Sequence, residues 1–288
     1  MELKHTAAHS GRLSAFLKEE MGISTGLMNR LKWKDQIFVN GIPQHTDYAV
    51  QPGDVITVPL DDPEPEYPAE DGALTVLYED DHLLAVDKPA GMLIHPSRTR
   101  LTGTLANLVL GYYRRTGQKC AFHPITRLDR DTFGIVLLAK NSHIHALFTQ
   151  QQEEKSIQKT YHALILGCPD TPEGLIDAPI ARRELPSLLR YVNHETGKPS
   201  LTRYQILEAK GAYSRVALQP ITGRTHQLRV HCAHIGCPIL GDPQYASEQS
   251  KALSETLGYF TQQLCARTLS FPHPITGETM TLSSQLDV

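Results

Sequence analysis

The chain has 288 residues, of which 40% are hydrophobic and 20% charged, and its formal net charge is −3 at pH 7. This length accommodates two domains, or one domain with an appendage. No apolar run approaches the roughly 20 residues that span a bilayer, and residues 1–6 lack the apolar core of a signal peptide. We therefore expect a cytoplasmic protein without a membrane partner. An odd number of cysteines in no regular framework indicates reduced thiols: Cys120, Cys168, Cys232, Cys237 and Cys265.

The first 60 residues contain two helical patterns followed by a small β-unit. Apolar residues recur at helical spacing over 12–21, and a second helix is predicted after Ser24, a favourable N-cap. Residues 36–39 and 54–58 are predicted strands, with Asn40-Gly41 as a turn.

This layout resembles an S4-like RNA-binding module, a small α/β unit. Three basic residues on and just after its second helix would then contact phosphates: Arg30, Lys32 and Lys34. The spacing alone fits a helical cap with a solvated basic edge equally well.

Residues 61–73 have the composition of a linker. They hold six acidic residues and no lysine or arginine, and they include Pro63, Pro65 and Pro68. Prolines stiffen such a segment, and repulsion between the acids extends it. We therefore predict an N-terminal domain over 1–60, a linker over 61–73 and a second domain over 74–288. The excess of acid lies in the linker, so any RNA-binding face elsewhere must be a local basic patch.

The second domain mixes strands and helices without regular βαβ units. Helices are predicted over 104–115 and 141–154, and a buried strand over 134–139. The other predicted strands, several with alternating polarity, cover 74–78, 82–87, 159–167, 201–208 and 213–219. This pattern predicts an α+β domain with a mixed, mainly antiparallel sheet flanked by helices.

The segment over 123–134 has the residues of a catalytic loop. Asp129 lies between Arg127 and Arg130, and Gly134 precedes an apolar run. Nearby guanidinium groups hold a carboxylate ionised, lowering its pKa by roughly 1–3 units, and such a carboxylate can act as a nucleophile or base. By itself the segment fits a surface loop with a local ion pair equally well.

Four stretches, taken together and in order, resemble the RluA-like (large-subunit-type) pseudouridine synthases. They are Asp87–Met92 followed by His95-Pro96, Arg127–Gly134, Lys159–Leu164 and Gly223–Arg229. The resemblance covers roughly residues 74–280. It implies an isomerase that converts uridine to pseudouridine in RNA, built on a mixed sheet that forms an RNA-binding cleft. It implies no metal and no redox cofactor.

The resemblance also assigns roles. Asp129 matches the carboxylate that acts beside the ribose. Tyr161 matches the tyrosine that lies against the target uracil and is a candidate for removing the C5 proton, although a strand aromatic packed in the sheet is the alternative. Arg224 matches the arginine that pairs with the aspartate, with phosphate binding as the alternative. The weaker candidates for contact with the RNA backbone are Lys88, Arg127, Arg130, Lys159 and Arg229. For Arg229 a structural role is the alternative.

Three positions depart from the family pattern. Thr126 stands where histidine is usual, Phe133 where serine is usual, and Cys265 where histidine is common. We expect these changes to alter loop geometry and substrate choice more than the reaction. The target uridine must leave its stack, which favours structured single-stranded RNA. Ribosomal RNA is the first expectation because of the S4-like layout, transfer RNA the second, and we expect a monomer.

Three other interpretations compete with this one. A zinc site could use the cluster of His226, His231, Cys232, His234 and Cys237, but its spacing fits no common structural pattern. A hydrolase using Asp129 with Asp131 is disfavoured, because carboxylates two residues apart cannot bracket a glycosidic bond. A catalytically inactive RNA-binding or ribosome-assembly factor on the same scaffold remains the alternative, against which the presence of all three site residues argues.

Overall fold

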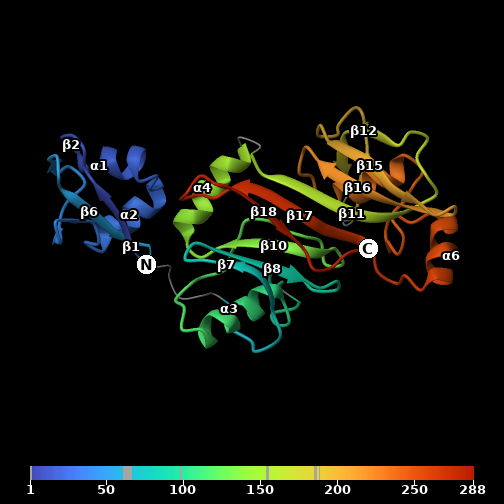
Figure 1. Cartoon of the computed structure of the whole chain (residues 1–288), viewed down its shortest axis with the longest axis horizontal. Helices are drawn as coiled ribbons and strands as arrows, with labels where there is room; N and C mark the ends of the chain where they lie inside the picture. The colour runs from blue at the N-terminus through green and yellow to red at the C-terminus, as the bar shows by residue number, and fades with distance from the viewer. Residues whose placement is uncertain (1, 61–66, 98, 154–155, 185–186, 188) are drawn as a thin grey trace.

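The computed structural model describes residues 2–60, 67–97, 99–153, 156–184, 187 and 189–288. Two sheets with separate hydrophobic cores account for most of the chain, and Figure 1 shows the N-terminal unit beside the larger second unit. The first part of the acidic Pro-rich segment, residues 61–66, lies outside the described residues. Within the described ranges, no helix combines the length and apolarity that crossing a bilayer requires.

The N-terminal unit is a four-stranded antiparallel sheet packed against short helices. Its strand order is β1 (Glu2–Thr6), β6 (Val55–Pro59), β3 (Phe38–Val39) and β4 (Ile42–Pro43), and β2 (Gly11–Arg12) pairs with β5 (Ala49–Val50). The first predicted helix is α1 (Leu13–Ala15), continued by a π-helical segment over Phe16–Glu20, and the second is α2 (Thr25–Trp33). The predicted helices and strands are thus confirmed, whereas β1 was not predicted because its residues are largely polar.

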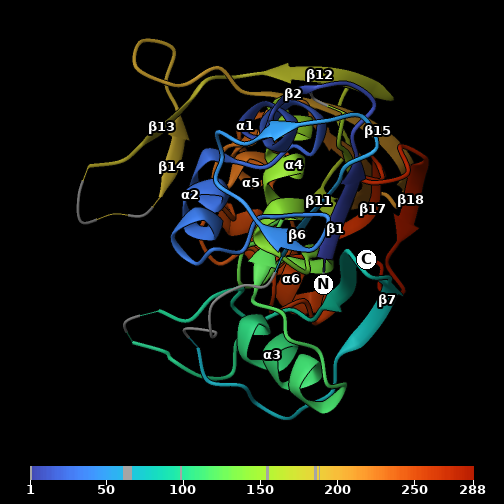
Figure 2. The same cartoon turned by 90° about the vertical axis from the view of Figure 1, so that its left-hand side faces the viewer.

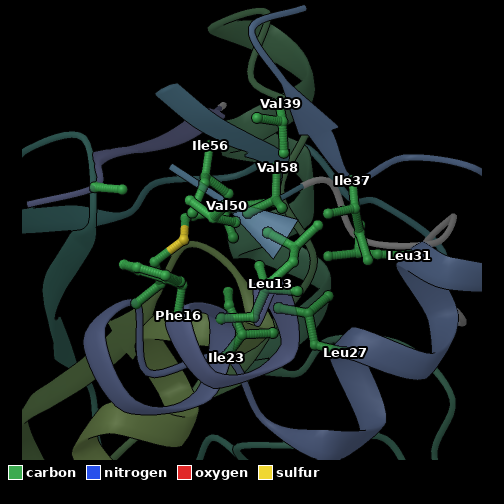
Figure 3. Close-up of a cluster of buried hydrophobic side chains, with 14 residues drawn as sticks. Leu13, Phe16, Ile23, Leu27, Leu31, Ile37, Val39, Val50, Ile56 and Val58 are labelled. Carbon is green, nitrogen blue, oxygen red and sulfur yellow. The ribbon is translucent and has the colours of Figure 1, made fainter. Parts of the chain in front are cut away.

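Local signals fix the ends of these elements. The Ser24 hydroxyl accepts the backbone N–H of Leu27 at 3.2 Å and caps α2. Asn40 and Gly41 both have positive φ, 52° and 80°, as the tight turn between β3 and β4 requires. Apolar side chains from the helices and strands then converge on one core, which Figure 3 shows in close-up.

The N-terminal unit contacts the second unit through α4 (Ser142–Glu153). Arg30 Nη2 donates to Ser142 Oγ at 3.4 Å. At Gly22 an added Cβ would lie 3.1 Å from Leu147 Cδ2, so the backbone before α2 lies close to the same helix. Arg30 therefore lies at this contact between the two units.

The second unit contains a ten-stranded sheet. Its main order is β12 (Glu173–Asp177), β15 (Leu201–Ala209), β16 (Tyr213–Pro220), β11 (Gln158–Leu166), β17 (Leu264–Pro272), β10 (Phe133–Ala139), β8 (Leu83–Lys88) and β7 (Thr75–Glu79). Two further strands, β18 (Thr279–Ser283) and β9 (His123–Pro124), pair with β17 and β10. Among these strands, β10 and β17 form the parallel pair and the other neighbours are antiparallel. The predicted mixed, mainly antiparallel α+β fold is confirmed.

Strands β8 and β10 are buried on both faces. Alternate residues of these strands pack against α3 (Leu105–Arg115) on one side, and the intervening residues pack with Ile144 and Phe148 of α4 on the other. Figure 2 shows the two helices on opposite sides of the sheet. This double cover explains the continuous apolar run over 134–139.

The last part of the predicted linker is packed rather than extended. Tyr67 and Ala69 lie against the α3 cluster. The Glu70 N–H donates to the carbonyl of Asn107 at 2.9 Å, and Asp71 forms ion pairs with Arg114 and Arg115 at 3.1 Å. Charge repulsion does not extend this stretch, because the arginines at the end of α3 pair with Asp71 and the Glu70 carboxylate accepts the backbone N–H of Gly103.

The parallel pairing of β10 with β17 depends on Gly134. Its φ is +104°, and an added Cβ would lie 2.4 Å from the carbonyl oxygen of Ala266. Gly134→Ala is therefore expected to destabilise the second unit by about 3 kcal/mol or more, from combined strain and overlap. Urea unfolding measures this change. Gly211→Ala is the control, because Gly211 also has positive φ but faces open space, and it should cost only about 1 kcal/mol. Equal costs would contradict the close approach of β10 to β17.

Candidate active site

The loop between β9 and β10 holds Asp129 between two anchored threonines. Buried Thr126 accepts the backbone N–H of Leu137 at 2.9 Å through its hydroxyl. At the other end Thr132, 3% exposed, accepts a hydrogen bond from the Gln262 side-chain amide. The Asp129 side chain between them is 32% exposed. A fixed loop therefore presents a partly accessible carboxylate, and Thr126, one of the departures from the family pattern, anchors the start of this loop.

Arg229 on α5 (Gln227–His234) is the partner of that carboxylate. Its Nη1 donates to Asp129 Oδ2 at 3.1 Å. Its Nε and Nη2 donate to both oxygens of Asp242 at 2.7 and 2.8 Å, and Nη2 also donates to Gln244. The guanidinium carbon lies 4.9 Å from the centre of the Tyr245 ring. The Asp242 side chain is fully buried and holds the Arg229 guanidinium group through Nε and Nη2. Nη1 is therefore the nitrogen that remains for Asp129.

Arg224, predicted to pair with Asp129, does not do so. Its side chain is exposed and donates through Nε to the carbonyl of Pro199 at 3.3 Å. The reason is that α5 begins at Gln227, which leaves Arg224 in the preceding turn. Arg229 is not available as a contact to the RNA backbone, because its side chain is only 5% exposed. Of the two roles that the sequence left open for it, the structural one applies.

Lys88 is also not the RNA contact that the sequence suggests. It is fully buried, and its Nζ donates to the carbonyls of Pro89, Met92 and Arg130 at 2.8–2.9 Å. Burial lowers the pKa of Lys88 to about 8, while the charges of Asp131 and Asp129 act in the opposite direction. This ammonium ties the loop after β8 to the residue that follows Asp129.

Lys88→Met is expected to lower stability by about 2 kcal/mol, because three buried carbonyl groups lose their donor. The turnover rate should also fall several-fold, since the loop that carries Asp129 loses an anchor. Urea unfolding and initial rates measure the two effects. Lys251→Met is the control, because that lysine is 52% exposed and pairs with an exposed glutamate, and it should change stability by less than about 0.5 kcal/mol. An unaltered Lys88→Met protein would contradict the anchoring role.

Tyr161 and Lys159 lie on one face of β11 and line a small cavity together with Thr126. Burial, with the nearby charge of Asp129, raises the pKa of Tyr161. The neutral phenol is therefore the resting form. It offers a ring for stacking, and it can accept a proton at oxygen only after giving up its own. Burial and the charge of Arg127 lower the pKa of Lys159.

The two arginines that flank Asp129 in sequence are exposed. Arg130 forms a two-pronged ion pair with its neighbour Asp131, at 2.9 and 2.8 Å, with its own side chain 58% exposed. Within the described residues, neither arginine pairs with the Asp129 carboxylate. Arg127 and Arg130 thus remain candidates for phosphate contacts at the rim of the site, as the sequence predicts.

The other two departures from the family pattern are neighbours in space. Phe133 of β10 and Cys265 of β17 are register partners in the parallel pair. A ring and a small thiol therefore occupy paired positions where the family usually has serine and histidine. Burial raises the pKa of Cys265 to about 12, so its thiol is neutral. Phe133 and Cys265 therefore affect the packing beside Gly134 and not the hydrogen-bond partners of Asp129.

Several histidines and cysteines of the alternative zinc site are occupied by other contacts. His231 is buried, and its ring nitrogens contact the Thr202 hydroxyl and the Ala178 carbonyl, both at 2.9 Å. Cys232 and Cys237 belong to an apolar cluster. In the described part of the chain, no group of three or more histidine, cysteine or acidic side chains could hold a metal ion.

Known proteins resemble this chain in sequence. A family model described as RNA pseudouridylate synthase matches residues 82–234, more than half of the chain. The uncharacterized RNA pseudouridine synthase YlyB of Bacillus subtilis is 37% identical over 247 residues, covering 84% of this chain and 79% of that protein. The ribosomal large subunit pseudouridine synthase D of Pseudomonas aeruginosa is 37% identical, covering 77% of this chain and 71% of that protein.

Solved structures show the same relationship. Human RNA pseudouridylate synthase domain containing 4 aligns with a TM-score of 0.61 at 26% identity, covering 74% of this chain and 88% of that one. Its human counterpart, domain containing 1, gives a TM-score of 0.59 at 25% identity, covering 76% of this chain and 93% of that one. Sequence and fold therefore lead to one conclusion: the chain belongs to the RNA pseudouridylate synthase family and is an isomerase that forms pseudouridine in RNA.

Proposed function

We propose that Asp129 is the carboxylate that acts on the target uridine. The observation that carries this proposal is the difference in hydrogen bonding between the two carboxylate oxygens of Asp129. Oδ2 accepts from Arg229, whereas no group in the described ranges donates to Oδ1. One oxygen is therefore anchored, and the other is left for the nucleotide on the exposed side of the loop.

The reaction conserves all atoms of the nucleotide. The bond between N1 and C1′ breaks, the uracil turns, and a bond forms between C5 and C1′, after which C5 loses a proton and N1 carries one. A fixed anion beside the ribose is the group that this bond exchange needs from the protein. Tyr161, half-buried and neutral, supplies a stacking surface worth roughly 1–3 kcal/mol for the freed base.

Ribosomal RNA is the proposed substrate. Relatives in Pseudomonas aeruginosa and Vibrio cholerae carry the names ribosomal large subunit pseudouridine synthase D and C. The helix–helix–strand layout of residues 1–60 supports an S4-like RNA-binding domain beside the catalytic domain. We also propose a cytoplasmic monomer: one chain supplies the site residues, and its cysteines follow no regular disulfide framework.

Tritium release from C5-labelled uridine tests the proposal. Ribosomal and transfer RNA are transcribed without pseudouridine, so that every acceptor site is available, and each is incubated with the protein. Release from ribosomal RNA, followed by mapping of the modified uridine, would support the proposed substrate. Release from transfer RNA alone would show that transfer RNA, and not ribosomal RNA, is the substrate. No release from either by folded protein would support the inactive RNA-binding alternative.

The N-terminal domain offers a direct probe of RNA contact. Trp33, the single tryptophan of the chain, is 87% exposed at the end of α2, between exposed Lys32 and Lys34. Of the three predicted phosphate contacts, Arg30 is half-buried and bonded to Ser142. The two lysines are therefore better placed, and a base stacked between them would contact the indole.

RNA binding is expected to quench Trp33 fluorescence, and salt should reverse the quenching because the lysine–phosphate contacts release counterions. Replacing Lys32 and Lys34 by serine should weaken the quenching titration several-fold without changing unfolding. Binding of labelled RNA, followed in parallel by anisotropy, is the control. Full RNA binding with unaltered tryptophan fluorescence would show that this end of α2 does not contact RNA.

A further inference from the structure

We propose that His226 is a positioning residue, a neutral imidazole whose Nε2 hydrogen holds Oδ2 of Asp129. This inference rests on the proposed role of Asp129. His226 Nε2 lies 3.8 Å from Asp129 Oδ2, the same oxygen that accepts from Arg229. The distance exceeds a hydrogen bond, but catalytic hydrogen bonds in unliganded sites are often long and tighten when substrate binds.

The backbone at His226 is held in an uncommon conformation. Its φ is 58° and its ψ 17°, in the left-handed region, at the residue that precedes α5. A residue other than glycine adopts this conformation at a cost, and such outliers gather where side-chain direction matters. The imidazole, 15% exposed, is thereby directed between Asp129 and Tyr245.

Hydrogen bonds on the far side of the ring favour one tautomer. The Tyr245 hydroxyl accepts the backbone N–H of Arg190 at 2.9 Å and lies 2.8 Å from His226 Nδ1. Its own hydrogen is then available to Nδ1, which acts as the acceptor. The single hydrogen of the neutral ring is left on Nε2, where it faces the carboxylate.

Burial of the ring favours its neutral form. Burial lowers the pKa of His226; Asp129 and Asp242 act in the opposite direction, and Arg229 and Arg190 act with burial. A neutral donor can orient a carboxylate without cancelling its charge. With Arg229 and His226 both directed at Oδ2, Oδ1 is the oxygen that keeps its lone pairs for the nucleotide.

Substitution by glutamine and by asparagine separates this role from a purely structural one. Glutamine places an amide N–H near the position of Nε2, whereas asparagine reaches only the position of Nδ1. Asparagine, however, is the better residue for the left-handed backbone. If His226 serves only the turn, asparagine should therefore be the milder change. If His226 instead holds Asp129, glutamine should be the milder change.

The measurement is the single-turnover rate of tritium release, with RNA affinity and urea unfolding determined for each variant. We expect His226→Asn and His226→Ala to lose roughly tenfold to a hundredfold in rate, the range for a lost hydrogen bond to a charged group. His226→Gln should stay within a few-fold of wild type, and RNA affinity should not change. An asparagine variant as fast as or faster than the glutamine variant would overturn the inference.

Tyr245→Phe is the second test, because it keeps the ring against Arg229 and removes only the hydroxyl. The rate should fall several-fold as His226 loses the contact that favours its tautomer, and the fall should vanish in the His226→Gln background. If Tyr245→Phe lowered the rate by the same factor in the His226→Gln background, Tyr245 would not act through His226, and the proposed network would be wrong. An inactive wild-type protein would instead overturn the role of Asp129, and this inference with it.

Discussion

Asp129→Ala is expected to reduce tritium release by roughly 10⁴-fold or more, the size of effect seen when a group that acts directly on the substrate is removed. Asp129→Asn should be nearly as inactive, because it keeps the shape and can still accept from Arg229 but carries no charge. RNA affinity should stay within a few-fold of wild type, since the carboxylate does not attract phosphates. Rates are measured at saturating RNA and affinities by filter binding.

Asp131→Asn is the matched control for this prediction. Asp131 lies in the same loop and its side chain is 13% exposed, but it is paired with Arg130 rather than with α5. Its replacement should lower the rate less than tenfold. If Asp131→Asn were as inactive as Asp129→Asn, both carboxylates would act and the assignment to Asp129 alone would be wrong. If Asp129→Asn kept its activity, the proposed carboxylate would be another residue.

Arg229→Leu is expected to affect stability and rate together. It leaves Asp242, whose side chain is fully buried, without its positive partner, and such a loss costs about 3–5 kcal/mol. The rate should also fall by roughly 10²-fold, because Asp129 loses the donor that orients it. Arg229→Lys should not restore either property, since an ammonium cannot bind both oxygens of Asp242 and reach Asp129.

A double variant separates the two effects of Arg229. Replacing Arg229 and Asp242 together by leucine removes the unpaired buried charge, so urea unfolding should recover most of the lost stability while the rate stays low. Arg224→Leu is the surface control, and it should change stability by less than about 0.5 kcal/mol. An Arg224→Leu protein as inactive as Arg229→Leu would show that the turn arginine also acts at the site.

Local patterns were sufficient for the elements with clear caps or apolar spacing. Helices α2, α3 and α4 follow from their caps and apolar spacing, and β8 and β10 from apolar runs that two layers of helix cover. Strand β1 was missed because its own residues are largely polar and its pairing with β6 involves residues at the other end of the unit. The stretch at 67–72 was predicted as linker because its acids have no partner nearby in sequence; in the fold, α3 supplies two arginines to Asp71, and Glu70 accepts the backbone N–H of Gly103.

The sequence by itself determined the family, the α+β class and the loop that carries Asp129, because these depend on residues close together along the chain. Only the tertiary structure decided which arginine meets the carboxylate, since Asp129 and Arg229 lie 100 residues apart and the start of α5 sets which side chain points inward. Burial likewise decided that Lys88 anchors a loop. A motif specifies which side chains are present, whereas packing and long-range hydrogen bonds specify which of them meet.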